Sequence, residues 1–273
     1  MRAPRFWYPK NKNPLDRAAA VCLSPLSYIF QAGAKVRKAF ADPYLSRVPV
    51  VCVGNAVAGG AGKTPTALAI AEMLKRAGHS PCFVTRGYGG SGELTCVDAS
   101  RHSAFDVGDE ALLLASSAPT WAARDRALAV QHAERQGSYI IMDDGLQNPH
   151  VTPSKSVLVI DGEVGIGNGR IIPAGPLREP FDVALEKADI VIVIGSRDRQ
   201  NLTAKAKVPV FYAKLKPILP PGFPMKCRFV AFAGIARPEK FFATAPSIHP
   251  VSTLASVRWE NSSAVIFGEI FQP

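Results

Sequence analysis

The chain has 273 residues, 47% of them hydrophobic and 20% charged, which is typical of a globular protein and excludes a disordered or fibrous one. Its formal net charge is +10, and residues 1–47 hold nine basic side chains against two acidic ones. A basic end of this kind favours an anionic partner, with a solvated basic face as the alternative. The five cysteines show no C-x-x-C spacing, so we expect reduced thiols and no metal cluster.

The N-terminal part contains an uncharged stretch from Ala18 to Ala34. It is shorter than the roughly 20 apolar residues that cross a bilayer. The aromatic residues Phe6, Trp7 and Tyr8 and several basic residues flank it, a pattern typical of a helix that lies in the headgroup layer of a membrane. A signal peptide and plain core packing are the two alternatives. We therefore predict that this part binds a membrane surface without spanning it.

From residue 48 the chain alternates between short apolar runs and helical patterns. Strands are predicted in the segments 48–54, 81–90, 138–145, 156–162, 188–196 and 208–214, and helices in 64–78, 109–118 and 126–137. Continuous apolar strands that alternate with helices predict an α/β fold, with a mostly parallel sheet covered on both faces. Gly54, Thr85, Asp143 and Asp161 each close a strand, so we expect the ligand at this carboxyl edge.

The segment "VGNAVAGGAGKTP", which starts at Val53, has the features of a phosphate-binding loop. Val57 stands where the strict G-x-x-x-x-G-K-[ST] pattern has its first glycine. The physical context is nevertheless complete, because a strand precedes the loop, three glycines can turn it, and a helix follows it. Lys63 can reach the terminal phosphates of ATP, and the Thr64 hydroxyl can bind Mg²⁺. A glycine-rich turn with an incidental lysine is the weaker alternative.

A pair of acidic residues, Asp143 and Asp144, follows a predicted strand and provides the second part of such a site. Tandem aspartates are also common in turns, so the pair gains weight only from the loop upstream. Asp109 and Glu110 begin a predicted helix. They could supply the base or orienting group that an acceptor hydroxyl needs, or they could only cap the helix.

The segment "GNGRIIPAGPLREP" combines three glycines and three prolines with Arg170, Arg178 and Glu179. Such a rigid loop with two arginines suits the binding of a phosphorylated substrate or a nucleotide. Together with "VPVVCVGNAVAGGAGKTP", "TRGYGG", "DVGDEALLLA", "IIMDDGLQNPHV" and "VAFAGIARPEKFF", it resembles the tetraacyldisaccharide 4′-kinase family over about residues 48–242. The resemblance implies a P-loop NTPase-like fold and ATP-dependent phosphorylation of the 4′-hydroxyl of an acylated glucosamine disaccharide 1-phosphate. It also implies a place at the cytoplasmic face of the inner membrane, and no nucleic-acid partner is expected.

The resemblance also implies roles for individual residues. The ATP phosphates would be wrapped by Val57, Ala58, Gly59, Gly60, Ala61, Gly62, Lys63 and Thr64. Asp109 would be the base for the acceptor, with Glu110 beside it. Asp143 would hold Mg²⁺ together with Thr64, Asp144 would serve the reacting phosphate, and Arg178 and Glu179 would lie near the nucleotide or the sugar.

Two other interpretations stay open. A regulatory or partitioning ATPase with a deviant phosphate loop would carry a lysine just before the glycine pair, where this chain has Ala58. An inactive or weak form of the kinase is suggested by the C-terminal part, where the family's Asp-His-His and Thr-Glu-Lys-Asp segments are absent after Thr244, as in a truncated or frameshifted chain. The expected domains are a membrane-interface segment (1–47), a kinase core (48–213), a proline-rich linker (214–226) and an incomplete C-terminal α/β domain (227–273).

Overall fold

The computed structural model describes residues 3–9, 13–195 and 198–215, and three short strands at 229–231, 253–254 and 267–269. The chain divides into two compact units, one from Ala3 to Lys214 and the other formed by residues 215–273 with residues 1–2. The first unit carries every candidate site residue. The proline-rich linker lies almost entirely outside the described residues.

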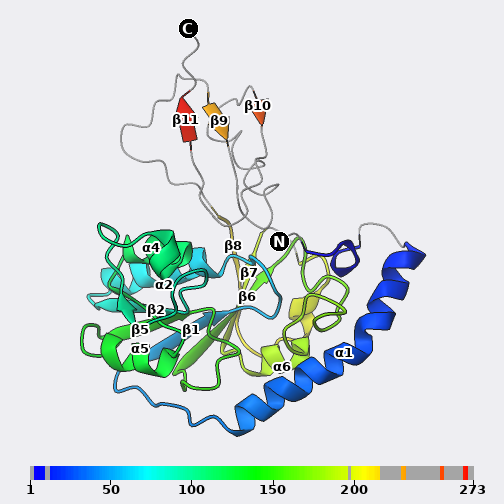
Figure 1. Ribbon diagram of the computed structural model, residues 1–273, viewed down its shortest axis with the longest axis horizontal. Coiled ribbons are helices and arrows are strands. Elements are labelled where there is room, and N and C mark those ends of the chain that lie inside the picture. Colours follow the sequence, from blue (N-terminus) through cyan, green and yellow to red (C-terminus); the bar gives the residue numbers. More distant parts are fainter. Residues whose placement is uncertain are drawn as a thin grey trace. The chain divides into compact units, whose positions relative to one another are not determined.

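The first unit is built on an eight-stranded sheet with the order β3-β4-β2-β5-β1-β6-β7-β8 (Figure 1). Every neighbouring pair is parallel except β3 and β4 at one edge. The strands are β1 (Val50–Gly54), β2 (Pro81–Thr85), β3 (Thr95–Cys96), β4 (Thr120–Ala122), β5 (Tyr139–Asp143), β6 (Lys155–Asp161), β7 (Ile190–Ile194) and β8 (Val210–Ala213). The predicted mostly parallel sheet is confirmed.

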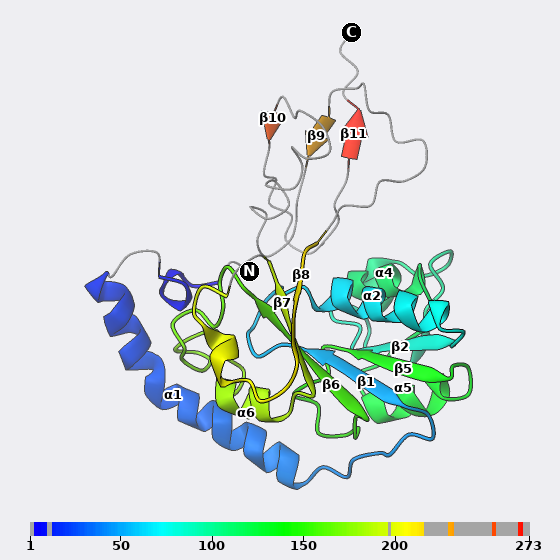
Figure 2. The same cartoon turned by 180° about the vertical axis from the view of Figure 1, so that it is seen from behind.

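The strands consist mainly of apolar residues because both faces of the sheet are covered. In β5, Ile140 and Met142 point into one core cluster, and Ile141 between them points into the other. The helices α2 (Lys63–Arg76) and α4 (Asp109–Ala115) cover one face, and α5 (Arg126–Ala133) and α6 (Phe181–Glu186) cover the opposite face (Figure 2). Buried side chains on both sides leave the carboxyl ends of the strands as the place for polar groups.

The N-terminal part forms a short 3₁₀ helix, η1 (Arg5–Trp7), and the long helix α1 (Pro14–Ala39). Asn13 caps α1, since its side chain accepts a hydrogen bond from the Leu15 N–H. Within α1 only Ala20 and Ser27 are buried, so the alternative of plain core packing for this stretch is wrong. None of the helices in the described part of the chain combines the length and apolar character needed to cross a bilayer.

Some elements differ from the sequence predictions. The strands β3 and β4 and the helices α3 (Ala104–Val107), α6 and η2 (Leu202–Lys205) were not predicted, because each is too short to show a period. The second unit contains a three-stranded sheet with the order β10-β9-β11, made of β9 (Phe229–Ala231), β10 (Thr253–Leu254) and β11 (Phe267–Glu269). The sequence of residues 227–244 predicts one strand and one helix, with no further strand after them, so only β9 is expected. The helix predicted between residues 227 and 244 lies outside the described residues, as does most of the region after Thr244.

Candidate active site

The phosphate-binding loop leads from the end of β1 into the first turn of α2. Gly62 adopts a left-handed conformation (φ +95°) as the N-cap of α2, and Gly59 has φ +114°. Gly54 also has to be glycine, because a Cβ there would lie 2.5 Å from Leu146 Cβ. This close approach holds the start of the loop against the turn that follows β5. Val57 and Ala61 are buried, whereas Gly59 and Gly60 are exposed, so the glycine pair forms the open part of the loop.

Thr64 and Asp143 meet at the carboxyl edge of the sheet. The Thr64 hydroxyl donates a 2.9 Å hydrogen bond to Asp143 Oδ2. The other carboxylate oxygen, Oδ1, is buried and has no hydrogen-bond partner among the residues that the structure describes. Burial raises the pKa of Asp143, and the Thr64 hydrogen bond and Lys63 oppose the rise. An unsatisfied buried carboxylate oxygen beside a threonine hydroxyl is the donor set that Mg²⁺ prefers.

Asp144 contacts basic side chains of the site. Its side chain lies 3.5 Å from Lys63 Nζ and accepts hydrogen bonds of 2.8 and 2.9 Å from Arg178 Nη1. Burial alone would raise the pKa of Asp144, but Lys63 and then Arg178 outweigh it and hold the pKa below its ordinary value. The residue also has a left-handed backbone, with φ +54°. Strain of this kind at a non-glycine residue is frequent at functional sites.

Asp109 and Glu110 form the first turn of α4. The N-cap is Gly108, and Asp109 Oδ1 accepts a 2.9 Å hydrogen bond from the Glu110 N–H. Gly108 is packed so tightly that a Cβ there would lie 2.5 Å from the Tyr88 carbonyl oxygen. Part of Glu110 faces solvent, but the protein around its carboxylate raises its pKa to about 7, with Asp143 adding to the rise and Lys63 opposing it. Glu110 therefore shares the electrostatic field of Lys63 and Asp143.

Glu110 should make the stability of the protein depend on pH. Its folded pKa of about 7 exceeds the ordinary value of 4.5. The free energy of unfolding therefore falls as pH rises from 4.5 to 7, and it stays at the lower value above pH 7. We expect Glu110→Gln to raise the melting temperature by about 2–4 °C at pH 8, the shift for roughly 1 kcal/mol. The free energy of roughly 1 kcal/mol is smaller than the full pKa shift would give, because water screens part of the carboxylate charge.

The measurement is thermal unfolding of the wild type and the variant at pH 5 and pH 8. At pH 5 we expect little difference between them. Glu93→Gln, which changes an exposed glutamate, is the matched control and should leave the melting temperature unchanged at both values. A gain that is equally large at both pH values would contradict the assignment of the raised pKa to Glu110.

Arg178 and Glu179 are adjacent in the chain but point to different partners. Arg178 joins Asp144, as described above, and also lies 3.3 Å from Gln147 Oε1. Glu179 accepts a 2.8 Å hydrogen bond from Gln147 Nε2 and pairs with Lys187. Arg178 thus belongs to the group of charged side chains around Lys63 and Asp144. Glu179 instead contacts Gln147 and Lys187.

The backbone joins this arginine to the phosphate-binding loop. The Arg178 N–H donates to the Ala56 carbonyl, and the Ala58 N–H donates to the Pro176 carbonyl, at 2.8 and 2.7 Å. Val57 and Leu177 form the bridge between these two hydrogen bonds. The valine that departs from the strict sequence pattern is therefore a strand-like residue that fixes the loop to the arginine segment.

Two residues of the site were not predicted from the sequence. Arg126 begins α5, is only 8% exposed, and donates a 2.8 Å hydrogen bond to the Asp144 carbonyl oxygen. Burial lowers its pKa. Gln147 donates to the Asn55 carbonyl as well as to Glu179 and so connects three segments. Arg126 belongs to no quoted motif. Gln147 lies within "IIMDDGLQNPHV", two residues after the Asp-Asp-Gly turn, but no role was assigned to it from the sequence.

The arrangement suits the binding and transfer of a phosphoryl group. Three cations, Lys63, Arg126 and Arg178, converge on Asp144, and each of them can compensate negative charge on phosphate oxygens. Glycines with positive φ and the N-terminus of α2 face the same place. Acidic side chains for a metal and for an acceptor hydroxyl come from β5 and α4.

The chain matches the family model described as tetraacyldisaccharide-1-P 4′-kinase over residues 19–254. It is 48% identical to the tetraacyldisaccharide 4′-kinase of Parvibaculum lavamentivorans over 251 residues, which are 89% of this chain and 72% of the relative. It is also 48% identical to the enzyme of that name from Rhodospirillum rubrum over 252 residues, which are 89% of this chain and 74% of the relative.

A solved structure shares the fold. It is described as the "apo" form of LpxK from Aquifex aeolicus in complex with ATP, and it superposes with a TM-score of 0.71 over 88% of this chain and 82% of the other. The sequence identity of that pair is 23%, so the comparison shows the fold. The predicted P-loop NTPase-like α/β architecture is confirmed by this likeness and by the parallel sheet.

Proposed function

The chain belongs to the tetraacyldisaccharide 4′-kinase family, and on that premise we propose how its site residues carry out the reaction. It is an ATP-dependent kinase that phosphorylates the 4′-hydroxyl of a tetraacyl glucosamine disaccharide 1-phosphate, a precursor of lipid A. The single observation that carries the proposal for the site is the meeting of Lys63 and Thr64 with Asp144 and Asp143.

Lys63 and the loop Val57–Thr64 bind the ATP phosphates in this proposal. The loop presents backbone N–H groups and a helix N-terminus, which stabilise negative charge without reorganisation. Lys63 pairs with Asp144, and its Nζ lies 3.4 Å from the Gly59 carbonyl oxygen. Its ammonium group exchanges these partners for the terminal phosphates, and Asp144 keeps Arg178 as its counter-ion.

Thr64 and Asp143 fit a Mg²⁺ ion that accompanies ATP. The fit rests on the buried Asp143 Oδ1, which has no hydrogen-bond partner in the described part of the chain, and on the neighbouring Thr64 hydroxyl. A magnesium ion bound there supplies charge neutralisation for the phosphates. The side chains themselves are already oriented, since Thr64 lies in the first turn of α2 and Asp143 ends β5.

Asp109 is the proposed base for the acceptor hydroxyl. The tight packing of Gly108 against Tyr88 fixes the backbone from which Asp109 projects. Glu110 follows Asp109 in α4, and its pKa, raised to about 7, responds to the charges of Asp143 and Lys63. Arg126 and Arg178 stabilise the charge of the transferred phosphoryl group.

A direct assay tests these roles. Labelled ATP, Mg²⁺ and a tetraacyl diglucosamine 1-phosphate are offered to the protein, and the bisphosphate product is measured. A partitioning ATPase would instead release phosphate to water without labelling the lipid. The loop gives no support to that class, because Ala58 stands where its signature lysine would be and its N–H is used in the bond to Pro176.

Helix α1 is the proposed membrane attachment. A narrow stripe with Ala20, Ser24 and Ser27 faces the protein, while large apolar side chains point to solvent. Those exposed on α1 and just after it are Leu15, Val21, Leu26, Tyr28, Ile29, Phe30, Val36 and Phe40. An apolar face of this size, with Arg17, Lys35, Arg37 and Lys38 around it, fits the surface of an anionic bilayer.

The aromatic cluster contributes less than the sequence suggested. Phe6, Trp7 and Tyr8 are half-buried, and Trp7 Nε1 donates a 3.0 Å hydrogen bond to the Pro173 carbonyl oxygen. The indole is therefore partly engaged with the protein itself.

We propose that the membrane in question is the inner membrane, contacted from its cytoplasmic face.

Binding to anionic vesicles should weaken with salt and with loss of the apolar face. Each basic residue near an anionic surface contributes about 1 kcal/mol, so raising the ionic strength should release part of the protein. We expect the triple variant Leu26→Ser, Ile29→Ser, Phe30→Ser to float with vesicles much less than the wild type at the same salt. Leu113→Ser, an exposed leucine on α4, is the control. If neither salt nor the triple substitution changes the fraction of protein that floats with the vesicles, the proposal is contradicted.

A further inference from the structure

The loop between β6 and α6 is held by helix α1 through side-chain hydrogen bonds. Arg170 Nη1 donates to Ser24 Oγ at 2.6 Å, and the Ser27 hydroxyl donates to the Ile171 carbonyl oxygen at 2.7 Å. Within α1 only Ala20 and Ser27 are buried, so apolar packing contributes little to this contact. The polar contacts therefore carry much of the attachment between the loop and the helix.

The 3₁₀ helix η1 holds the same loop at two further places. The Asn168 N–H donates to the Trp7 carbonyl oxygen at 2.8 Å, and the Asn168 side-chain amide donates to the Phe6 carbonyl oxygen at 2.9 Å. Trp7 Nε1 donates in return to the Pro173 carbonyl oxygen. Two elements of the N-terminal part thus hold residues 168–173 from the same side of the loop.

The loop then turns back on itself, and its second half reaches the phosphate-binding loop. The Leu177 N–H donates to the Arg170 carbonyl oxygen at 3.0 Å, and the Ile172 N–H donates to the Leu177 carbonyl oxygen at 2.9 Å. Leu177 also forms the bridge to Val57 described above. Arg170 and Arg178 are therefore joined by a short ladder of backbone hydrogen bonds, which continues into the phosphate-binding loop.

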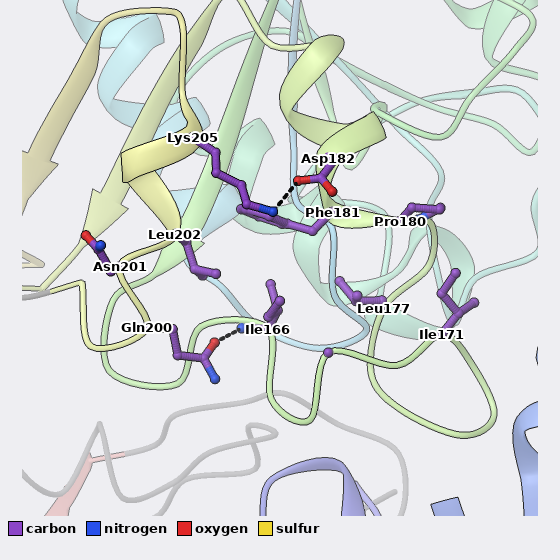
Figure 3. Close-up of a pocket in the computed structure, with 11 residues that line it drawn as sticks. Ile166, Ile171, Leu177, Pro180, Phe181, Asp182, Gln200, Asn201, Leu202 and Lys205 are labelled. Atoms are coloured by element: carbon purple, nitrogen blue, oxygen red, sulfur yellow. Dashed lines mark hydrogen bonds and ion pairs between the residues drawn. The ribbon is translucent and has the colours of Figure 1, made fainter. Parts of the chain in front are cut away.

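A cavity of about 350 Å³ borders this ladder, between the loops after β6 and β7. Figure 3 shows Ile171 and Leu177 at its wall, near Pro180. The cavity lies behind Arg178, because Leu177 and Pro180 line it and Arg178 follows Leu177 in the chain. Close packing is what normally resists the displacement of a buried segment. Since the cavity gives no such support here, the hydrogen bonds to the N-terminal part have more weight.

We propose that Arg170 is a positioning residue for phosphoryl transfer, which acts through this ladder on Arg178. The proposal rests on the role proposed above for Arg178, the stabilisation of charge on the transferred phosphoryl group. The Arg170 guanidinium itself contacts Ser24 on the inner stripe of α1. Helix α1 therefore has a second role beside the proposed membrane contact, because it completes the frame that aligns the site. A misplacement of about 1 Å can cost about 10²-fold in rate, so this alignment has a measurable effect.

Arg170→Ala tests the proposal by turnover. We expect turnover to fall about 10- to 10²-fold with the acceptor lipid dispersed in detergent, where binding to a bilayer plays no part. Because Arg170 acts through Arg178, the double variant Arg170→Ala, Arg178→Ala should turn over as fast as Arg178→Ala alone. Arg76→Ala is the matched control, since it removes an exposed arginine that pairs with Glu72 at the end of α2, and it should keep wild-type turnover.

The partner on α1 supplies a rescue experiment. Ser24→Ala removes the acceptor of the Arg170 hydrogen bond, so we expect it to lower turnover and to add nothing to the loss in Arg170→Ala. Ser24→Thr keeps the hydroxyl group and should retain most of the turnover. Equal losses in Ser24→Ala and Ser24→Thr would contradict a role for this hydrogen bond.

Hydrogen exchange gives a measurement that does not depend on turnover. Backbone amide exchange is followed by NMR in the wild type and in Arg170→Ala. The N–H groups of Ala58 and Arg178, which bond to Pro176 and Ala56, should exchange at least about tenfold faster in the variant. The amides of β5 should keep their rates, because the core of the sheet is not changed.

The two measurements separate the possible failures. Unchanged exchange at Ala58 and Arg178, or an equal acceleration throughout β5, overturns the positioning proposal, as does a double variant whose losses multiply. A loss of turnover in Arg178→Ala but not in Arg170→Ala overturns the positioning proposal alone. Wild-type turnover of Arg178→Ala would instead contradict the role proposed for Arg178, and with it the positioning proposal.

Discussion

Replacing Lys63 with alanine is expected to weaken ATP binding and to lower phosphoryl transfer by about 10²- to 10³-fold. The side chain is only 9% exposed and lies between Asp144 and the Gly59 carbonyl oxygen, at the start of α2. No other lysine ammonium group among the described residues pairs with Asp144. The loss therefore removes the mobile positive charge that follows the terminal phosphates.

The measurement is ATP affinity by calorimetry together with lipid phosphorylation. Lys75→Ala is the matched control, because Lys75 lies on the same helix but its ammonium group donates a hydrogen bond to the Ser117 hydroxyl. A melting curve of each variant separates a folding defect from a binding defect, and Arg178 still pairs with Asp144 when Lys63 is gone. Unchanged affinity and unchanged transfer in Lys63→Ala would show that the loop does not bind the nucleotide.

The frame of the site could be read from the sequence because its signals are local. An unbroken apolar run that ends in Gly54 or Asp143 predicts a buried parallel strand and a polar edge, and both strands end at these residues in the structure. The glycines and Lys63 predict the loop in the same way. The identity of Val57 does not disturb the loop, because this residue only has to form the bridge to Leu177.

The remaining features depend on contacts between distant segments. Arg126 is an ordinary helix-starting residue until β4 and β5 bring it beside Asp144. Glu179 looks equivalent to Arg178 in the sequence, but the chain direction places it against Gln147 and Lys187. The cavity behind Arg178 forms only when the loops after β6 and β7 meet, and no spacing of residues predicts such a volume. Tertiary packing decides each of these cases.

Asp109→Asn is expected to lower turnover by about 10²- to 10⁴-fold with little change in ATP affinity. Asparagine keeps an oxygen that can accept the hydrogen bond from the Glu110 N–H, so the first turn of α4 is preserved. It cannot take a proton from the acceptor hydroxyl at neutral pH. The change thus removes the proposed base and leaves the geometry of the helix start.

Asp106→Ala is the control that distinguishes catalysis from helix capping. Asp106 lies in the preceding turn, where its carboxylate accepts hydrogen bonds from the Ser103 N–H and hydroxyl at 2.7 Å. Loss of a cap costs about 0.5–2 kcal/mol of stability and does not affect the chemical step. This variant should therefore have a lower melting temperature and an unchanged turnover rate. If Asp109→Asn behaves in the same way, with a lower melting temperature and full turnover, Asp109 is a structural residue of α4. A variant that melts like the wild type and has lost only turnover identifies the base.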